Sequence, residues 1–174
     1  MSNIFRSNIF KWSLLLFIVL LGACLVYFIY LYFDIQANKT EGFDEAKQIA
    51  LQNTTLVDVD QIVRFHGDEP YYVLFGKSAE DEELLVFVPF NYEPDDPLIV
   101  VNQLEIMSEH TIINSWEQEC HQCKFIKITP GILNDEPLWE LMYIDSSDRY
   151  VLDYVSMYDG SPYEQLRFKT MFQR

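Results

Sequence analysis

The most reactive pattern in the sequence is Cys120-His121-Gln122-Cys123. A redox Cys-x-x-Cys pair needs its first sulfur at a helix N-terminus, where the helix dipole lowers the thiol pKa. Here the pair follows a predicted helix, so the dipole at that end has the opposite sign. Three interpretations stay open: a local disulfide or inert thiols that stiffen a helix-to-strand corner, weak metal binding, and redox chemistry.

Metal binding at this motif lacks a full set of ligands. A structural zinc site uses four ligands, commonly two cysteine pairs or one pair with two histidines. Besides His121 the chain has only His66 and His110, without a His-x3–5-His spacing. We therefore predict no metal and no cofactor, and we keep a thiol-redox or metal-handling protein as an alternative function.

Motifs for hydrolysis are missing from the sequence. It contains no Gly-x-Ser-x-Gly elbow, no Ser-x-x-Lys and no His-Glu-x-x-His. Acid pairs such as Glu80 and Glu83 or Asp58 and Asp60 arise by default among 27 acidic residues, and solvated turns explain them better than a glycosidase dyad. We predict that the protein is not an enzyme and has no small-molecule substrate.

The net charge excludes another class of partner. The formal charge is −15, and every acidic residue lies after Phe33. An acidic surface repels nucleic acid and anionic polymers. No nucleic-acid partner is expected.

Aromatic side chains follow both predicted hairpins and could form a binding surface. Alternation along a strand sends half of them to the helix-covered face and half to the other face, where exposed Tyr and Trp would suit a partner. The alternatives are that both faces are buried between two modules, or that the tyrosines are simply exposed. The candidate partner-binding residues are Tyr72, Trp139, Tyr143 and Tyr154.

An apolar run from Leu14 to Phe33 indicates that the protein is located at a membrane. About 20 helical residues cross a bilayer core, and only a helix satisfies its backbone there. Arg6 and Lys11 precede the run and Asp34 follows it, so the positive-inside rule places the N-terminus in the cytoplasm. The predicted segments are a cytoplasmic tail (1–11), a transmembrane helix in contact with membrane lipid (12–33) and a juxtamembrane linker (34–40).

Two other fates of the apolar run stay open. A cleaved signal peptide has a shorter apolar region, and cleavage here would leave an apolar new N-terminus. Leu21-Gly22-Ala23-Cys24 is similar to a bacterial lipobox, which would lipidate Cys24. A chain usually turns polar after a lipobox, whereas nine apolar residues follow here. An uncleaved single-span anchor is the favoured prediction.

An internal repeat organises the remaining residues. Asp68-Glu69-Pro70 and Asp135-Glu136-Pro137 lie 67 positions apart (135 − 68), and the alignment continues without a gap through Asp81 with Asp148. Each copy is predicted to be one helix followed by three antiparallel strands, which makes an α+β fold. We place the first module at residues 41–94 and the second at residues 95–174.

The elements of each module follow from periodicity and turn signals. The first module has a predicted helix from Phe43 to Leu51 and strands at Leu56–Phe65, Tyr71–Gly76 and Leu84–Phe90. The second has a short opening strand at Leu98–Val101, a helix from Ser108 to Glu119 with Ser108 as N-cap, and strands at Lys124–Ile128, Leu138–Ile144, Tyr150–Tyr158 and Tyr163–Phe168. The proline-rich segment 92–97 is the predicted linker between them.

The second module resembles a known family. The segment PLWELMYIDSSDRYVLDYVSMYDGSPYE is similar to the PepSY pattern of an apolar strand, an acidic turn, an aromatic-rich strand and an Asp-Gly turn. The whole layout, with its N-terminal span and VDQIVRFHGDEPYYVLFG, resembles the TseB/YpmB family of cell wall elongation regulators in Gram-positive bacteria. Cys120 and Cys123 depart from that pattern.

The resemblance implies a single-pass membrane protein with two tandem PepSY-like (cystatin-like) domains outside the cell. It also implies contact with a class B penicillin-binding protein of the peptidoglycan machinery. The predicted function is thus a membrane-anchored, extracytoplasmic regulator of cell wall elongation, with its N-terminus cytoplasmic and its domains extracellular. Because PepSY domains resemble protease-associated propeptides, a protease inhibitor or folding helper is a further alternative.

Overall fold

The computed structural model describes residues 2–94 and 96–169. The ends of the predicted segments at Met1, Asp95 and 170–174 lie outside the described residues. The chain divides into two compact units, one up to Gly42 and one from Phe43 onwards.

The first unit is one continuous helix, α1 (Ser2–Thr40), which includes the segment expected as a linker at 34–40. No proline or glycine interrupts the helix after Gly22, and it stops just before Gly42, whose φ of 77° suits a glycine beyond a helix end. Within the described residues, Leu15–Tyr32 is the one helical stretch long and apolar enough to span a membrane. That stretch is compatible with a single-pass anchor or with a signal sequence.

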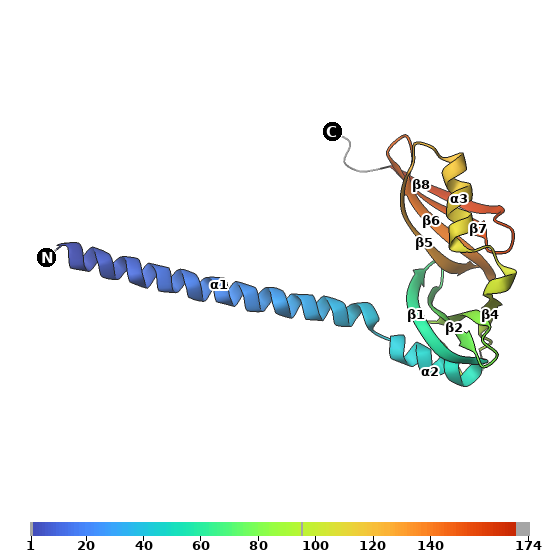
Figure 1. Ribbon diagram of the computed structural model, residues 1–174, viewed down its shortest axis with the longest axis horizontal. Helices are drawn as coiled ribbons and strands as arrows, with labels where there is room; N and C mark the ends of the chain where they lie inside the picture. The colour runs from blue at the N-terminus through green and yellow to red at the C-terminus, as the bar shows by residue number, and fades with distance from the viewer. Residues whose placement is uncertain (1, 95, 170–174) are drawn as a thin grey trace. The chain divides into compact units, whose positions relative to one another are not determined.

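The second unit contains two antiparallel sheets, each of four strands, and a helix with each (Figure 1). The elements of the first half are α2 (Phe43–Asn53), β1 (Leu56–His66), β2 (Pro70–Ser78), β3 (Glu83–Pro89) and β4 (Ile99–Asn102). A short 3₁₀ helix, Gln103–Glu105, leads to α3 (Glu109–Glu119), β5 (Lys124–Leu133), β6 (Glu136–Ile144), β7 (Arg149–Ser156) and β8 (Pro162–Lys169). The strand orders are β1-β2-β3-β4 and β5-β6-β7-β8, which confirms the predicted α+β class.

The predicted start of α3 is confirmed in detail. Ser108 is the N-cap, and its hydroxyl accepts a hydrogen bond from the Thr111 backbone N–H. One turn apart, Ile112 and Trp116 form the buried face of the helix.

The short strand expected to open the second module belongs to the first sheet instead. β4 pairs antiparallel with β3, with Leu84 opposite Asn102. The first sheet therefore ends at Asn102, beyond the boundary expected at residue 94. The repeat agrees with this assignment of β4 to the first sheet. A shift of 67 positions carries β4 onto residues 166–169, which lie inside β8, the fourth strand of the second sheet.

The same shift of 67 relates the other elements of the two halves. It carries α2, β1, β2 and β3 onto α3, β5, β6 and β7 to within one residue at each end. It also relates the hairpin turns, since Asp81 and Asp148 (148 − 81 = 67) have positive φ angles of 63° and 55°. Aspartate tolerates this conformation better than most residues.

The two halves share one hydrophobic core. Phe65, Val73 and Phe87 of the first sheet belong to the same buried cluster as Ile132 and Leu138 of the second. A separate cluster lies between α2 and the other face of the first sheet. Five consecutive residues of β3, from Leu84 to Val88, are all buried, as expected for a strand that is covered on both faces.

β5 runs to Leu133, five residues beyond its predicted end at Ile128. Pro130 and Gly131 lie within this extension. In the structure both pair with β6, and a side chain at Gly131 would collide with the ring of Phe65. The glycine is therefore needed where β1 and β5 approach each other.

Candidate functional site

Three of the four predicted partner-binding aromatics are in the core. Trp139, Tyr143 and Tyr154 are 2%, 5% and 5% exposed, so the expectation that they form an exposed surface is wrong. Trp139 Nε1 donates to the Met107 carbonyl at 2.9 Å, and the Tyr154 hydroxyl donates to Glu140 Oε2 at 2.9 Å. Burial of both sheet faces, the alternative left open by the sequence, applies to these residues.

Tyr72 differs, because it is half-buried in an aromatic cluster of the first sheet. Its ring stacks on Phe90 with centroids 4.1 Å apart and meets the edge of Phe43 at 5.8 Å. The Arg64 guanidinium lies 5.8 Å from the Tyr72 ring centroid, within the range of a cation–π contact. A role for Tyr72 in partner binding stays a prediction.

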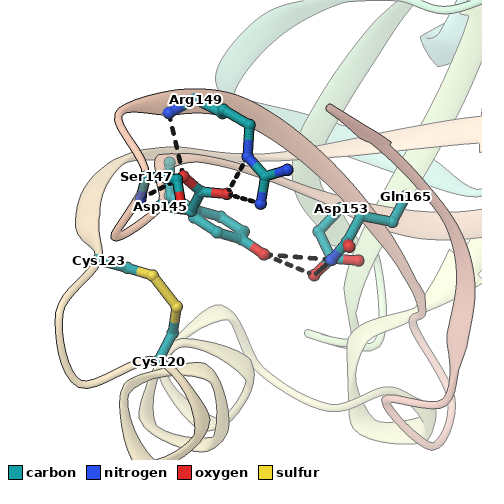
Figure 2. Close-up of a disulfide and its surroundings, with 8 residues drawn as sticks. Cys120, Cys123, Asp145, Ser147, Arg149, Asp153 and Gln165 are labelled. Carbon is teal, nitrogen blue, oxygen red and sulfur yellow. Dashed lines mark hydrogen bonds and ion pairs between the residues drawn. A yellow bond between two sulfur atoms is a disulfide. The ribbon is translucent and has the colours of Figure 1, made fainter. Parts of the chain in front are cut away.

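Cys120 and Cys123 form a disulfide that closes the corner between α3 and β5 (Figure 2). Cys120 is the C-cap of α3, and its backbone N–H donates to the Trp116 carbonyl. The pair lies at the C-terminal end of the helix, as predicted. Among the described residues no group of three or more His, Cys, Asp or Glu could hold a metal ion.

Removing the disulfide tests its structural role. Cys120→Ser with Cys123→Ser is expected to lower the free energy of unfolding by about 2 kcal/mol, because a short loop in the unfolded chain is no longer closed. Thermal unfolding followed by circular dichroism, with and without dithiothreitol, measures the loss. Reductant should affect only the native protein. If the double variant loses biological function while it remains folded, the redox alternative gains support.

The β6–β7 hairpin is closed by Asp145. Its carboxylate accepts hydrogen bonds from the backbone N–H of Ser147 and of Arg149, at 2.9 and 3.0 Å (Figure 2). It also accepts from Arg149 Nε at 2.8 Å and pairs with a second guanidinium nitrogen at 2.7 Å. The Arg149 side chain and these backbone donors lower the pKa of the Asp145 carboxyl to about 2.

This lowered pKa predicts a dependence of stability on pH. The carboxylate stabilises the fold above the ordinary pKa of 3.8, and this contribution is lost as pH falls towards 2. Asp145→Asn should be less stable than the native protein at pH 7 and should lose less stability between pH 5 and pH 2. Urea denaturation across this range measures the effect, with the exposed Glu117→Gln as control. Parallel curves for Asp145→Asn and the native protein would contradict it.

A cavity of about 510 Å³ lies between α3 and the strands β7 and β8. Trp116, Ile112 and Glu119 line it from the helix, and Asp153 and Gln165 line it from the strands. The face of α3 that packs against this sheet carries bulky side chains, and the aromatic ring of Trp116 packs on Phe125 and Tyr143. The cavity combines an apolar and aromatic wall with a polar one.

A hydrogen-bonded network forms the polar wall (Figure 2). Asp153 Oδ2 accepts from Gln165 Nε2 at 2.8 Å and from the Tyr143 hydroxyl at 3.2 Å. Burial raises the pKa of the Asp153 carboxyl above its ordinary value, although these hydrogen bonds oppose the shift. Burial, with the charge of Asp153, raises the pKa of Tyr143 to about 12.

The lining of this cavity is acidic and apolar. It contains four carboxylates and one serine, but no histidine, cysteine or lysine that would activate a nucleophile. The serine, Ser115, donates its hydroxyl hydrogen bond to the Thr111 carbonyl within the helix. The side chains of this site therefore offer negative charge and apolar contact.

Asp153 and Gln165 were not among the residues predicted from the sequence. The repeat held a signal for Asp153, because 67 positions earlier stands Val86, which is fully buried in β3. A carboxylate at the position of a core valine marks a polar interruption on the helix-covered face of the second sheet. No comparable signal in the sequence marks Gln165.

The chain thus consists of an apolar N-terminal helix followed by a duplicated α+β unit with a cavity in its second half. A family model described as the cell wall elongation regulator TseB-like domain matches residues 45–89, from α2 to β3. The chain is 27% identical over 137 residues to the probable cell wall elongation regulator TseB of Bacillus subtilis (strain 168), covering 75% of this chain and 80% of that protein.

A solved structure agrees with these sequence matches. The YpmB protein from Bacillus subtilis superposes with a TM-score of 0.66 at 27% identity, over 73% of this chain and 98% of that chain. The predicted resemblance to the TseB/YpmB family is confirmed by all three similarities. The family model covers α2 to β3 of the first half, so the cavity beside α3 lies outside the matched segment.

Proposed function

We propose that this protein is a membrane-anchored, extracytoplasmic regulator of cell wall elongation that acts by contact with a class B penicillin-binding protein. The observation that carries the general role is the similarity to the probable cell wall elongation regulator TseB along three quarters of the chain. The contact with a penicillin-binding protein follows from the family resemblance.

The N-terminal helix supports the proposed location. Its apolar stretch is long enough to span a bilayer, and Arg6 and Lys11 precede it while Asp34 follows. A single span in the membrane raises the effective concentration of the globular part near other membrane proteins, so that a weak contact is enough. This suits a protein that regulates by binding.

The alternatives have less support. A redox function would use Cys120 and Cys123, but the pair caps the C-terminal end of α3, where the dipole does not favour a thiolate. A protease inhibitor or folding helper rests only on the resemblance of PepSY domains to propeptides. Neither competes with the similarity to a wall regulator.

Photo-crosslinking in living cells tests the proposal. A benzophenone amino acid is placed at Leu104 or Phe168, which are 85% and 51% exposed in the first and second halves. We expect at least one position to capture a penicillin-binding protein, identified by mass spectrometry. The matched control carries the same residue at Val19 inside the apolar helix. Recovery of no wall-synthesis protein from either exposed position would contradict the proposed contact.

A further inference from the structure

The helix and the sheet pack differently in the two halves of the repeat. In the first half α2 approaches its sheet through Ala46 and Ala50, both fully buried, above the apolar side chains of Leu74 and Val86. In the second half the helix presents Ile112 and Trp116. The bulky face, together with a carboxylate in place of a valine, accompanies the cavity of about 510 Å³.

The charged side chains that line this cavity are all acidic. Glu119 comes from α3, Asp153 from β7, Asp159 from the β7–β8 turn and Glu164 from β8. Arg167 on β8 lowers the pKa of Asp153 through its charge, but it does not line the cavity. A cationic group would therefore find several carboxylates around it and no cation among the lining residues.

A second and independent observation concerns Trp116. This side chain is 9% exposed, and within the described part of the chain its buried indole Nε1 has no hydrogen-bond partner. Buried donors are almost always paired. The atom is closed off from solvent, so a ligand in the cavity would supply the missing acceptor once the indole ring turns toward it.

The apolar part of the wall restricts the ligand further. Met107, Leu141 and Val155 line the cavity beside the carboxylates, and they suit an aliphatic chain. The volume of the cavity lies within the range of about 300–1,000 Å³ typical of ligand sites. A metal ion does not fit this description, since the described residues contain no cluster suited to hold one.

We propose that this cavity binds a lysine or arginine side chain in an extended segment of a partner protein. The cationic group lies against Asp153 and Glu119, and the aliphatic stem lies on the apolar wall. The indole ring of Trp116 turns toward the cavity on binding, and its Nε1 then donates to a backbone carbonyl of the segment. This site rests on the proposed function and adds a contact surface to it, but the test of the site needs no wall-synthesis protein. A failure of peptide binding therefore does not decide whether the protein contacts a penicillin-binding protein, and the reverse is also true.

Peptide binding to the full chain in lipid nanodiscs tests this site. The probes are acetyl-Ala-Lys-Ala-amide and acetyl-Ala-norleucine-Ala-amide, which differ in the charged end of one side chain. Isothermal titration calorimetry is expected to show about tenfold tighter binding of the lysine peptide, as for a charge-assisted hydrogen bond. Glu119→Gln with Asp153→Asn should remove that preference. Trp116→Phe should weaken binding about three- to tenfold, because it deletes the N–H donor.

A matched control separates the site from general electrostatic attraction. Glu80→Gln with Glu82→Gln removes two charges from the exposed β2–β3 turn and should leave binding unchanged. Asp153→Val introduces the residue found at the equivalent position of the first half, Val86. This variant should stay folded by circular dichroism and should lose peptide binding. Equal affinity for both peptides, equal loss in the control variant, or equally tight binding of n-butylamine would overturn the proposal.

Discussion

Replacing Phe65 with alanine is expected to destabilise the globular part, residues 43–174, by about 3–5 kcal/mol, as for other buried Phe→Ala changes. Phe65 is 2% exposed at the end of β1, and its ring occupies the space left open at Gly131 of β5. It belongs to the cluster that both sheets share. Because domains of this kind are stable by only about 5–15 kcal/mol, the loss is a large fraction of the total.

Urea denaturation with two probes measures this effect and tests the shared core. Trp116 and Trp139, the two tryptophans after residue 42, lie in the second half, so their fluorescence reports that half. Far-UV circular dichroism reports both halves. The native protein should unfold in one transition, and Phe65→Ala in the first half should shift both signals together. Phe168→Ala, at a position 51% exposed, is the control and should cost less than about 0.5 kcal/mol. An unchanged fluorescence midpoint in Phe65→Ala would contradict a shared core.

Most elements could be predicted because their signals are local. Ser108 is followed by an apolar pair one turn apart, Ile112 and Trp116, and this pattern alone predicts the start and the buried face of α3. The repeat of the Asp-Glu-Pro turn predicts a duplicated unit, and the structure has the same element order in both halves. Such signals depend on neighbours along the chain, not on distant contacts.

The errors arise where distant contacts decide. The prolines near residue 94 suggested a boundary between modules, but β4 returns to pair with β3. Alternation predicts that Trp139 and Tyr143 share a face of β6, but it cannot tell which segment covers that face. α3 covers it here: Trp116 packs on Tyr143, and Trp139 donates to Met107, just before the helix.

The candidate site could be predicted only in part. The cysteine pair was visible from its spacing, and the structure joins it. The cavity could not be predicted from the sequence, because it depends on the spacing between α3 and its sheet. The bulky side chains of Trp116 and Ile112, which line the cavity, contribute to that spacing. Asp153 could have been recognised by comparing it with Val86 in the other half of the repeat.

Deleting residues 15–32 is expected to move the protein almost completely from the membrane fraction to the soluble fraction. This stretch is apolar, and no described side chain of the chain covers it. Only a bilayer or a detergent micelle would then hide it from water. Fractionation with an alkaline wash, followed by immunoblotting, measures the change. A leucine-alanine helix of the same length in its place is the control and should restore membrane retention.

Point changes make the same test without shortening the chain. Leu21→Arg and Leu25→Arg lie near the centre of the stretch, where each charge costs about 2.5–3.5 kcal/mol on insertion scales. Two such charges should release most of the protein from the membrane, whereas Leu21→Phe with Leu25→Phe should not. Intact mass spectrometry of the native protein distinguishes the alternatives that remain. A chain that begins at Cys24 and carries acyl groups would identify a lipoprotein. A chain that lacks the whole apolar stretch would identify a cleaved signal peptide. Either result would refute the uncleaved anchor.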